Sequence, residues 1–184
     1  MAFRNKRGLI SLMLIFFIFF ALFVMIIAGT AFYGIETFDN AARNITGMNV
    51  GNVSFSDTYE DTLGRGLRTV LSTLSTISMA LILGMIIVML IIGFKMPKQN
   101  KLWIILDLFI IVVAFIAAVY ISVIFNDFIN SSETFLNIYS VDLQKPSTFL
   151  LNLPFVIAIV GGLIILATYV SSRGGKEPNV LEFN

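Results

Sequence analysis

The sequence predicts an all-α polytopic membrane protein, a bundle of four transmembrane helices that extend in part beyond the outer face. Three observations support this prediction. Of the 184 residues, 58% are hydrophobic and 12% are charged, which lies outside the range of soluble domains. Four apolar stretches are long enough to be membrane spans, at about residues 8–33, 69–94, 102–125 and 149–172. Basic residues gather on one side of these spans, and the whole chain is expected to form one membrane domain.

The third observation starts from a short basic connector at 95–101, which separates two membrane-length apolar stretches. Pro97 cannot continue the incoming helix, because it lacks a backbone N–H and clashes with the preceding turn. The connector also holds three lysines, Lys95, Lys98 and Lys101. Lysines in a short loop are retained on the cytoplasmic side. We therefore expect an inner turn here, outer loops at about 36–68 and 126–145, and both termini in the cytoplasm or the interior of a virion.

The charge balance of the whole chain agrees with this orientation. The inner segments contain eight basic and two acidic residues, whereas the outer loops contain four basic and eight acidic residues. This excess of lysine and arginine inside is the positive-inside pattern of membrane proteins. The expected location is an integral position in a cell membrane or a virion membrane, and no basic patch predicts binding to nucleic acid.

The chain begins with a basic head followed by an uncharged run over residues 8–35. A secretory signal peptide has the same order of features, but this run is about twice as long as a signal core of about 7–15 residues. We therefore expect a first transmembrane helix. Residues 36–44 favour helix, so this helix is expected to project from the membrane. Asp57 and Glu60 are spaced as in a capping box, which predicts that the next helix begins near Asp57.

Three N-x-S/T sequons lie in the predicted outer loops, at Asn44, Asn52 and Asn130, and none lies in an inner segment. Such sites accept N-linked glycans on surfaces outside the cytoplasm. The sequons therefore support the same orientation by a criterion independent of charge. They predict a glycosylated outer face in an archaeal or eukaryotic host or in one of their viruses.

Hydroxyl side chains fall on one face of the predicted second span. They follow each other at spacings of three and four residues, at Thr69, Ser72, Thr73 and Thr76. We expect this face to pack against a neighbouring helix, which the hydroxyls could bond. The alternative is that they line a polar path through the membrane, and packing is preferred because hydroxyls can also bond carbonyls of their own helix.

Asp107, in the third span, is the one ionisable residue inside a predicted span. A charge in the hydrocarbon core is costly, so an intramembrane acid is by default a candidate for function. Asp107 follows Lys101 by six residues, however, which is about 9 Å along a helix and within reach of the inner interface. A structural role near the headgroups is therefore preferred over an ion or proton site.

Small residues predict a close contact between the third and fourth spans. In the third span they repeat every four residues, at Ala114, Ala118 and Ser122. In the fourth span Ala158 and Gly162 form a small-xxx-small pair, which lets two backbones approach closely. Pro154 lies near the outer end of that span. It is harmless in a first helical turn and produces a kink deeper in a helix, and the sequence leaves both positions open.

The residues that catalysis and cofactor binding commonly use are missing. The chain has no cysteine and no histidine, which excludes disulfides and thiol chemistry and removes the usual ligands of zinc, haem and copper. We predict no catalytic, cofactor or metal site and no enzymatic activity. Three outer acids, Asp57, Glu60 and Asp61, are expected to form a solvated face in preference to a cation site.

Several short groups of residues occur in a fixed order in spans two to four. They are the stretch 83–90, the lysine connector, Ser122 with Asn126, and Asn152-Leu153-Pro154 before Gly161-Gly162. In these groups the chain resembles uncharacterised small four-span membrane proteins of marine microbial and viral genomes, including viruses with a membrane inside or around the capsid. The resemblance covers about residues 83–169 and departs in the connector, where Met96-Pro97-Lys98 replaces an aromatic or histidine-proline turn. It implies no functional residue.

These observations favour a non-enzymatic membrane scaffold or structural protein of a cell membrane or virion envelope. Its expected partners are the lipid bilayer, further copies of itself, and capsid or envelope proteins. The alternative is a small channel, transporter or accessory subunit, in which Asp107 and the hydroxyls of the second span face a common aqueous path. A third hypothesis is a holin-like protein that forms membrane lesions as a large oligomer.

Overall fold

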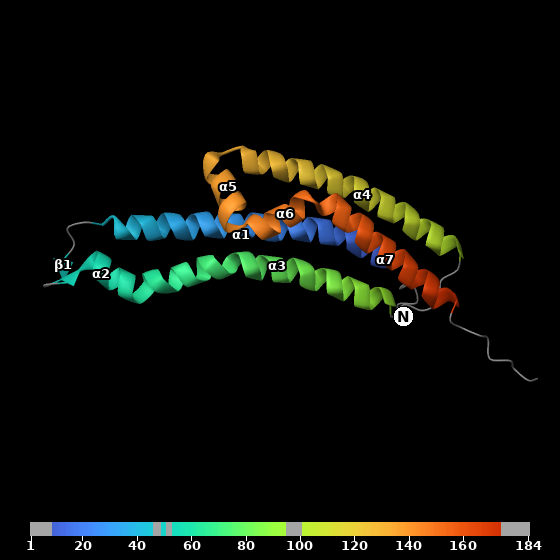
Figure 1. Ribbon diagram of the computed structural model, residues 1–184, viewed down its shortest axis with the longest axis horizontal. Helices are drawn as coiled ribbons and strands as arrows, with labels where there is room; N and C mark the ends of the chain where they lie inside the picture. The colour runs from blue at the N-terminus through green and yellow to red at the C-terminus, as the bar shows by residue number, and fades with distance from the viewer. Residues whose placement is uncertain (1–8, 46–48, 51–52, 95–100, 174–184) are drawn as a thin grey trace, which may run out of the picture.

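The computed structural model describes residues 9–45, 49–50, 53–94 and 101–173, which form an elongated set of helices (Figure 1). Two-residue strands β1 (Asn49–Val50) and β2 (Val53–Ser54) pair antiparallel. The helical elements are α1 (Leu9–Arg43), α2 (Phe55–Tyr59), the π-helix η1 (Glu60–Gly64), α3 (Arg65–Phe94), α4 (Lys101–Asn130), α5 (Glu133–Asn137), the π-helix η2 (Ile138–Asp142), α6 (Gln144–Leu151) and α7 (Leu153–Arg173). Lys95, Lys98 and Asn52 lie outside the described residues.

In the described part of the chain, three helices are long and apolar enough to cross a membrane. They cover Leu12–Arg43, Phe55–Gly93 and Ile105–Asn130. The pair α6 and α7 meets the same criterion when counted as one span, but it is bent by 70°. α1 begins and α7 ends at the same end of the molecule (Figure 1). The structure confirms the helical class and the presence of three to four helices of membrane-spanning length.

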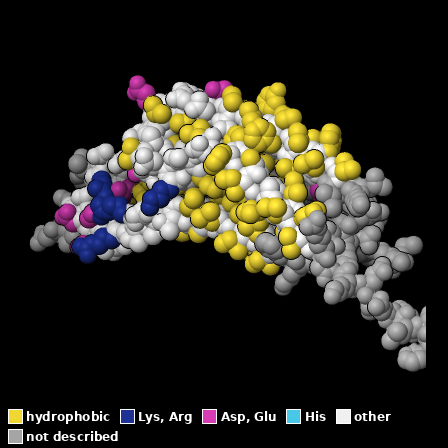
Figure 2. Space-filling view, turned by 45° about the vertical axis from the view of Figure 1, so that its right-hand side comes forward, with side chains coloured by type: hydrophobic (Ala, Val, Ile, Leu, Met, Phe, Trp, Pro, Cys, Tyr) yellow, Lys and Arg dark blue, Asp and Glu magenta, His cyan; other side chains and the backbone are white. Residues whose placement is uncertain are grey.

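The long helices bury one face each and expose the other. α1 contacts α3 and α4, and α7 contacts both of these helices as well. Leu14, Phe17 and Ile18 of α1 are fully buried, whereas Phe16 and Phe19 are more than half exposed. On the face drawn in Figure 2, hydrophobic side chains gather over the part of the described chain away from the charged end. Such a surface is stable where lipid replaces water around it.

α1 and α3 extend beyond the rest of the molecule. The 35 residues of α1 correspond to about 52 Å, compared with a hydrocarbon thickness of about 30 Å. α5 reaches α1 near Tyr33, whose ring lies 6.3 Å from that of Phe135. Past this level the described chain consists of the last turns of α1, the strand pair, α2, η1 and the start of α3. We call this part the α1–α3 extension; its arginines mark the left end of Figure 2.

The α1–α3 extension begins its second arm earlier than the sequence predicted. Ser54, which has an extended backbone, accepts a hydrogen bond at its hydroxyl from the backbone N–H of Asp57, at 3.2 Å. α2 therefore begins at Phe55. The observed start lies within two residues of the predicted one near Asp57. The capping hydroxyl belongs to Ser54, and Asp57 supplies the bonded N–H.

α4 and α7 are in close contact, but the residues of α7 that meet α4 differ from the predicted ones. Ala114 and Ala118 of α4 are fully buried. On α7, a Cβ added at Gly161 would lie 2.6 Å from Cγ2 of Ile111. Ala158 is exposed and nothing lies within 4 Å of a Cβ added at Gly162. The predicted pair was wrong because the bend before α7 sets which face of that helix meets α4.

A matched pair of glycine substitutions tests this contact. Gly161→Ala should destabilise the protein by about 1–3 kcal/mol, because its methyl group overlaps the buried Ile111 side chain. Gly162→Ala should be neutral or slightly stabilising, since alanine has the higher helix propensity and finds open space. Thermal unfolding in detergent measures both. Equal melting temperatures for the two variants would contradict the observed register, and Ile111→Ala should relieve the Gly161→Ala defect.

Candidate functional site

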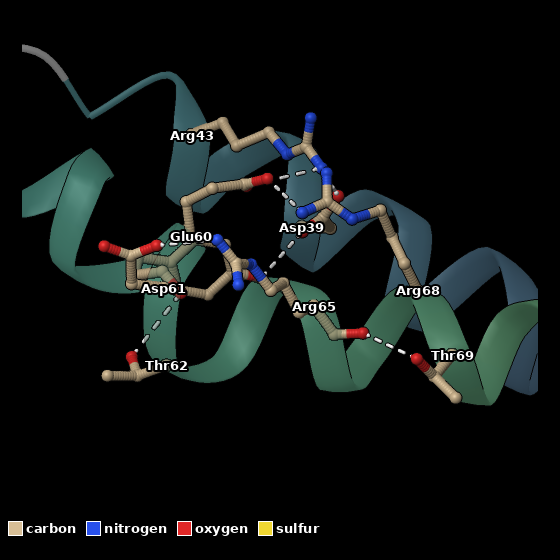
Figure 3. Close-up of polar contacts among 9 residues, drawn as sticks. Asp39, Arg43, Glu60, Asp61, Thr62, Arg65, Arg68 and Thr69 are labelled. Carbon is tan, nitrogen blue, oxygen red and sulfur yellow. Dashed lines mark hydrogen bonds and ion pairs between the residues drawn. The ribbon is translucent and has the colours of Figure 1, made fainter.

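The densest group of charged side chains lies in the α1–α3 extension (Figure 3). Asp39 and Arg43 are one turn apart at the end of α1, and Glu60 is the first residue of η1. Arg68 lies in the first turn of α3, and Tyr59 ends α2. We call these five residues the ionic network, because they join the two arms of the extension.

Contacts in the ionic network run from α1 to α3. The Tyr59 hydroxyl donates to Oδ1 of Asp39 at 2.9 Å, and Nη2 of Arg43 lies 2.9 Å from the other oxygen, Oδ2. The same Arg43 nitrogen lies 3.6 Å from Oε2 of Glu60. Nη2 of Arg68 donates to Oε1 of Glu60. Asp39 is only 7% exposed, and both of its oxygens have a partner.

The π-helical turn and a glycine make room for this arrangement. A π-helical turn changes the direction in which successive side chains point, and such turns occur frequently at functional sites. η1 begins with Glu60 and ends with Gly64, which is buried. A Cβ added at Gly64 would lie 3.0 Å from Oε2 of Glu60 and 3.4 Å from the Tyr59 ring. A side chain at position 64 would therefore crowd the Glu60 carboxylate and touch the Tyr59 ring.

The electrostatics of the ionic network keep its donors protonated. The network lies in the charged part of the chain, before the apolar stretch of α3. Burial, and then the hydrogen bond to Asp39, raise the pKa of the Tyr59 phenol. The hydrogen bond to Glu60 raises the pKa of the Arg68 guanidinium. These groups form a neutralised bridge between two helices, and their partners leave no free nucleophile or base among them.

The three outer acids behave differently from one another. Glu60 bridges Arg43 and Arg68, whereas Asp61 pairs with Arg65 at 3.1 Å on the surface, with both side chains more than 70% exposed. No group of three or more acidic, histidine or cysteine side chains within the described ranges could hold a metal ion. A solvated face describes Asp57 and Asp61, and Glu60 belongs to the ionic network.

The hydroxyl face of α3 does not bond a neighbouring helix, so that prediction was wrong. Thr69, Ser72, Thr73 and Thr76 are all exposed. Thr69 donates to the carbonyl of Arg65 at 2.9 Å, and Ser72 and Thr73 donate to the carbonyl of Thr69. A hydroxyl in a helix can always reach the carbonyl of the preceding turn, and no partner helix covers this face within the described chain.

Asp107 and Thr76 lie at different depths along their helices. Asp107 is 6% exposed and lies six residues after the start of α4, about 9 Å along the axis. Thr76 is exposed and lies 18 residues, about 27 Å, before the end of α3. The ends of α3 and α4 that the connector joins lie at the same end of the molecule (Figure 1).

The asparagines of two of the three sequons fall within the described residues, and Thr46 of the first sequon lies outside them. Asn44 is exposed just after α1, and Asn130 is the exposed last residue of α4. The Asn130 side-chain nitrogen donates to the carbonyl of Asn126 at 2.8 Å, and the Ser132 hydroxyl of the same sequon accepts from the backbone N–H of Thr134. Both asparagines lie at the ends of helices that run away from the chain termini (Figure 1).

A second junction, which the sequence did not indicate, joins the α5–η2 segment to α1. The Tyr139 side chain is buried and its hydroxyl donates to the carbonyl of Met25 at 2.9 Å. A Cβ added at Gly29 would overlap the Tyr139 ring and hydroxyl, so glycine is required there. The Tyr139 ring also packs edge-on against the ring of Phe125 of α4, with centroids 5.3 Å apart.

A third junction lies at the bend between α6 and α7. Asn152 is the C-cap residue that follows α6, and Pro154 lies in the first turn of α7. Nδ2 of Asn152 donates to the carbonyl of Thr148 at 2.8 Å. The Ser122 hydroxyl of α4 donates to the carbonyl of Leu151 at 2.6 Å. Ser122, predicted as a packing residue, is therefore also a hydrogen-bond donor to the bend.

Comparison with protein-family models, with curated proteins and with solved structures gives no match to this chain. The function is therefore argued from the geometry of the chain itself. That geometry consists of an exposed apolar surface along the long helices, a charged extension held by the ionic network, the buried Tyr139 contact with α1, and the contact of Ser122 with the α6–α7 bend.

The ionic network predicts how the extension responds to loss of Asp39. Asp39→Ala removes the acceptor of Tyr59 and one partner of Arg43, so backbone amides of residues 55–64 should exchange with deuterium at least about fivefold faster. Asp61→Ala removes only an exposed pair and should change exchange by no more than about twofold. Hydrogen–deuterium exchange with mass spectrometry measures both, and equal effects would show that Asp39 does not hold the two arms together.

Proposed function

We propose that this chain is a non-enzymatic scaffold of a cell or virion membrane, built as a four-transmembrane-helix bundle. α1, α3 and α4 form three spans, and the bent pair α6–α7 forms the fourth. The observation that supports a scaffold most directly is the ionic network. It holds the two arms of the extension together with buried Asp39 at its centre, as a surface that must keep its shape outside the bilayer would require.

The proposed orientation places the extension outside and both termini inside. The lysine connector follows α3 and precedes α4, at the opposite end of α3 from the ionic network. Basic residues in short loops are retained in the cytoplasm. In this orientation Asn44 and Asn130 are available for glycosylation, and the outer face of the scaffold carries glycans.

Exposed apolar side chains on the extension support a role in protein contact. Phe38 is 57% exposed and Leu63 is 59% exposed, although both lie beside the charged side chains of the ionic network. Large apolar side chains exposed outside the lipid are candidates for contact with another protein. We propose further copies of this chain, or capsid or envelope proteins, as the partners of this surface.

The positions of Asp107 and the α3 hydroxyls favour the scaffold over a channel. A shared aqueous path needs its polar groups on facing surfaces along a continuous line. Thr76 lies on an exposed face, Asp107 is buried, and their depths differ by about 18 Å by helix rise. One observation favours the alternative of a transport accessory subunit: α6–α7 is a broken helix, a feature that transporters use at their binding sites.

Cysteine labelling tests the proposed orientation, because the chain has no cysteine of its own. Ser56→Cys, in the extension, should react with a membrane-impermeant maleimide on intact cells. Lys98→Cys, in the connector, should react only after the membrane is permeabilised. Labelling of position 98 but not of position 56 on intact cells would show that the protein has the opposite orientation.

Flux measurements separate the scaffold from the channel. Liposomes that contain the purified protein should leak protons and alkali cations no faster than empty liposomes, because a scaffold of this kind does not need Asp107 and the α3 hydroxyls to face a common aqueous path. Fluorescent pH and potassium indicators measure this. A flux that Asp107→Asn abolishes, with Asp127→Asn as the control, would establish the transport alternative, and release of large dyes would establish the holin-like one.

A further inference from the structure

A polar cavity lies between the end of α4, η2 and α6. Its volume is about 260 Å³. The polar part of its lining comes from Asn126, Asn130, Ser140, Gln144, Ser147 and Thr148. The remaining wall is formed by aliphatic side chains and by Tyr139, whose own hydroxyl is bonded to α1. The cavity is separate from the ionic network and plays no part in the scaffold argument.

Ser147 marks this cavity as a binding site. The residue is only 4% exposed, and its backbone N–H bonds the carbonyl of Leu143 at 3.0 Å. Its hydroxyl has no hydrogen-bond partner anywhere in the described chain. A buried hydroxyl without a partner is destabilising, and it lines the cavity, where a ligand can supply the missing bond.

The lining selects for the chemistry of the ligand. No charged side chain lines the cavity, so an ion would find no counter-charge. Amides and hydroxyls each offer both donors and acceptors, which suits a group with several hydroxyls. The aliphatic wall suits the C–H faces of such a group. A volume below the range of about 300–1,000 Å³ for drug-sized pockets limits the ligand to one small ring or a short polyol.

We propose that this cavity binds an uncharged polyhydroxyl group the size of glycerol or a monosaccharide. The group can belong to a free polyol or to the headgroup of a membrane glycolipid. In the cavity its hydroxyls would bond Ser147 and Thr148, while its C–H face would lie against the aliphatic wall.

Binding measurements on the full-length protein distinguish these two sources. The protein is produced in a host without N-glycosylation, so that Asn130 is unmodified, and is kept in a detergent that contains no sugar. Free glycerol and free glucose are titrated by calorimetry. In parallel, thermal unfolding is compared in nanodiscs of phosphatidylcholine with and without monoglucosyl diacylglycerol. Binding of a free probe assigns a free polyol, and stabilisation by the glycolipid alone assigns a lipid headgroup.

Ser147→Ala should weaken the binding of whichever probe binds by at least about fivefold, the loss expected for one hydrogen bond. Without a probe this variant should melt at or above the wild-type temperature, because it removes an unpartnered buried hydroxyl. Ser72→Ala, which removes an exposed hydroxyl bonded within its own helix, should bind like the wild type. Thr148→Val, a variant of matched shape, repeats the test if Ser147→Ala does not fold.

Two results would overturn the proposal. One is that neither the free probes nor the glycolipid binds, accompanied by a lower melting temperature for Ser147→Ala; this would assign the cavity to structural water. The other is binding with equal strength in the wild type, Ser147→Ala and Thr148→Val, which would place the ligand elsewhere on the molecule.

Discussion

In the hydrocarbon core of a membrane, every backbone N–H and C=O must find its partner within the protein, because no water is present to replace it. α1, α3 and α4 meet this requirement along their own length. At the bend between α6 and α7 the carbonyl of Thr148 keeps a backbone partner, the N–H of Asn152, and also accepts from the Asn152 side chain. The carbonyl of Leu151 accepts from the Ser122 hydroxyl of α4. The bend therefore depends on a neighbouring helix, which in turn fixes how α7 faces α4.

Composition and the spacing of apolar residues were sufficient to predict the helical class and the long apolar helices. Uncharged runs of more than 20 residues have few stable alternatives to helix in a membrane. The bend was not predictable, since Pro154 suits both a first turn and a kink, and the choice depends on the Ser122 contact. The unpredicted bend also explains why the sequence selected Ala158 and Gly162 as the packing residues of α7. Gly161 and Gly162 are adjacent and chemically identical, and only the direction of the chain after the bend selects Gly161.

The ionic network was predictable only in part. Asp39 and Arg43 are four residues apart on a helix, a spacing that suggests a pair. Their contacts with Tyr59 and Glu60 depend on how the chain turns between α1 and α2, and on a π-helical turn that has no sequence marker. The hydroxyls of α3 show the opposite case: their spacing suggested an interhelical contact, but carbonyls of the same helix were nearer partners.

The insertion of Tyr139 against Gly29 has a consequence for biogenesis. Its partner on α1 is the carbonyl of Met25, 114 positions earlier in the chain. At about 5–20 residues per second, a ribosome needs roughly 6–23 s to synthesise the intervening segment. During that interval the surface of α1 at Gly29 has no Tyr139 side chain to cover it. The contact between the N-terminal and C-terminal halves therefore forms only after the C-terminal half has been synthesised.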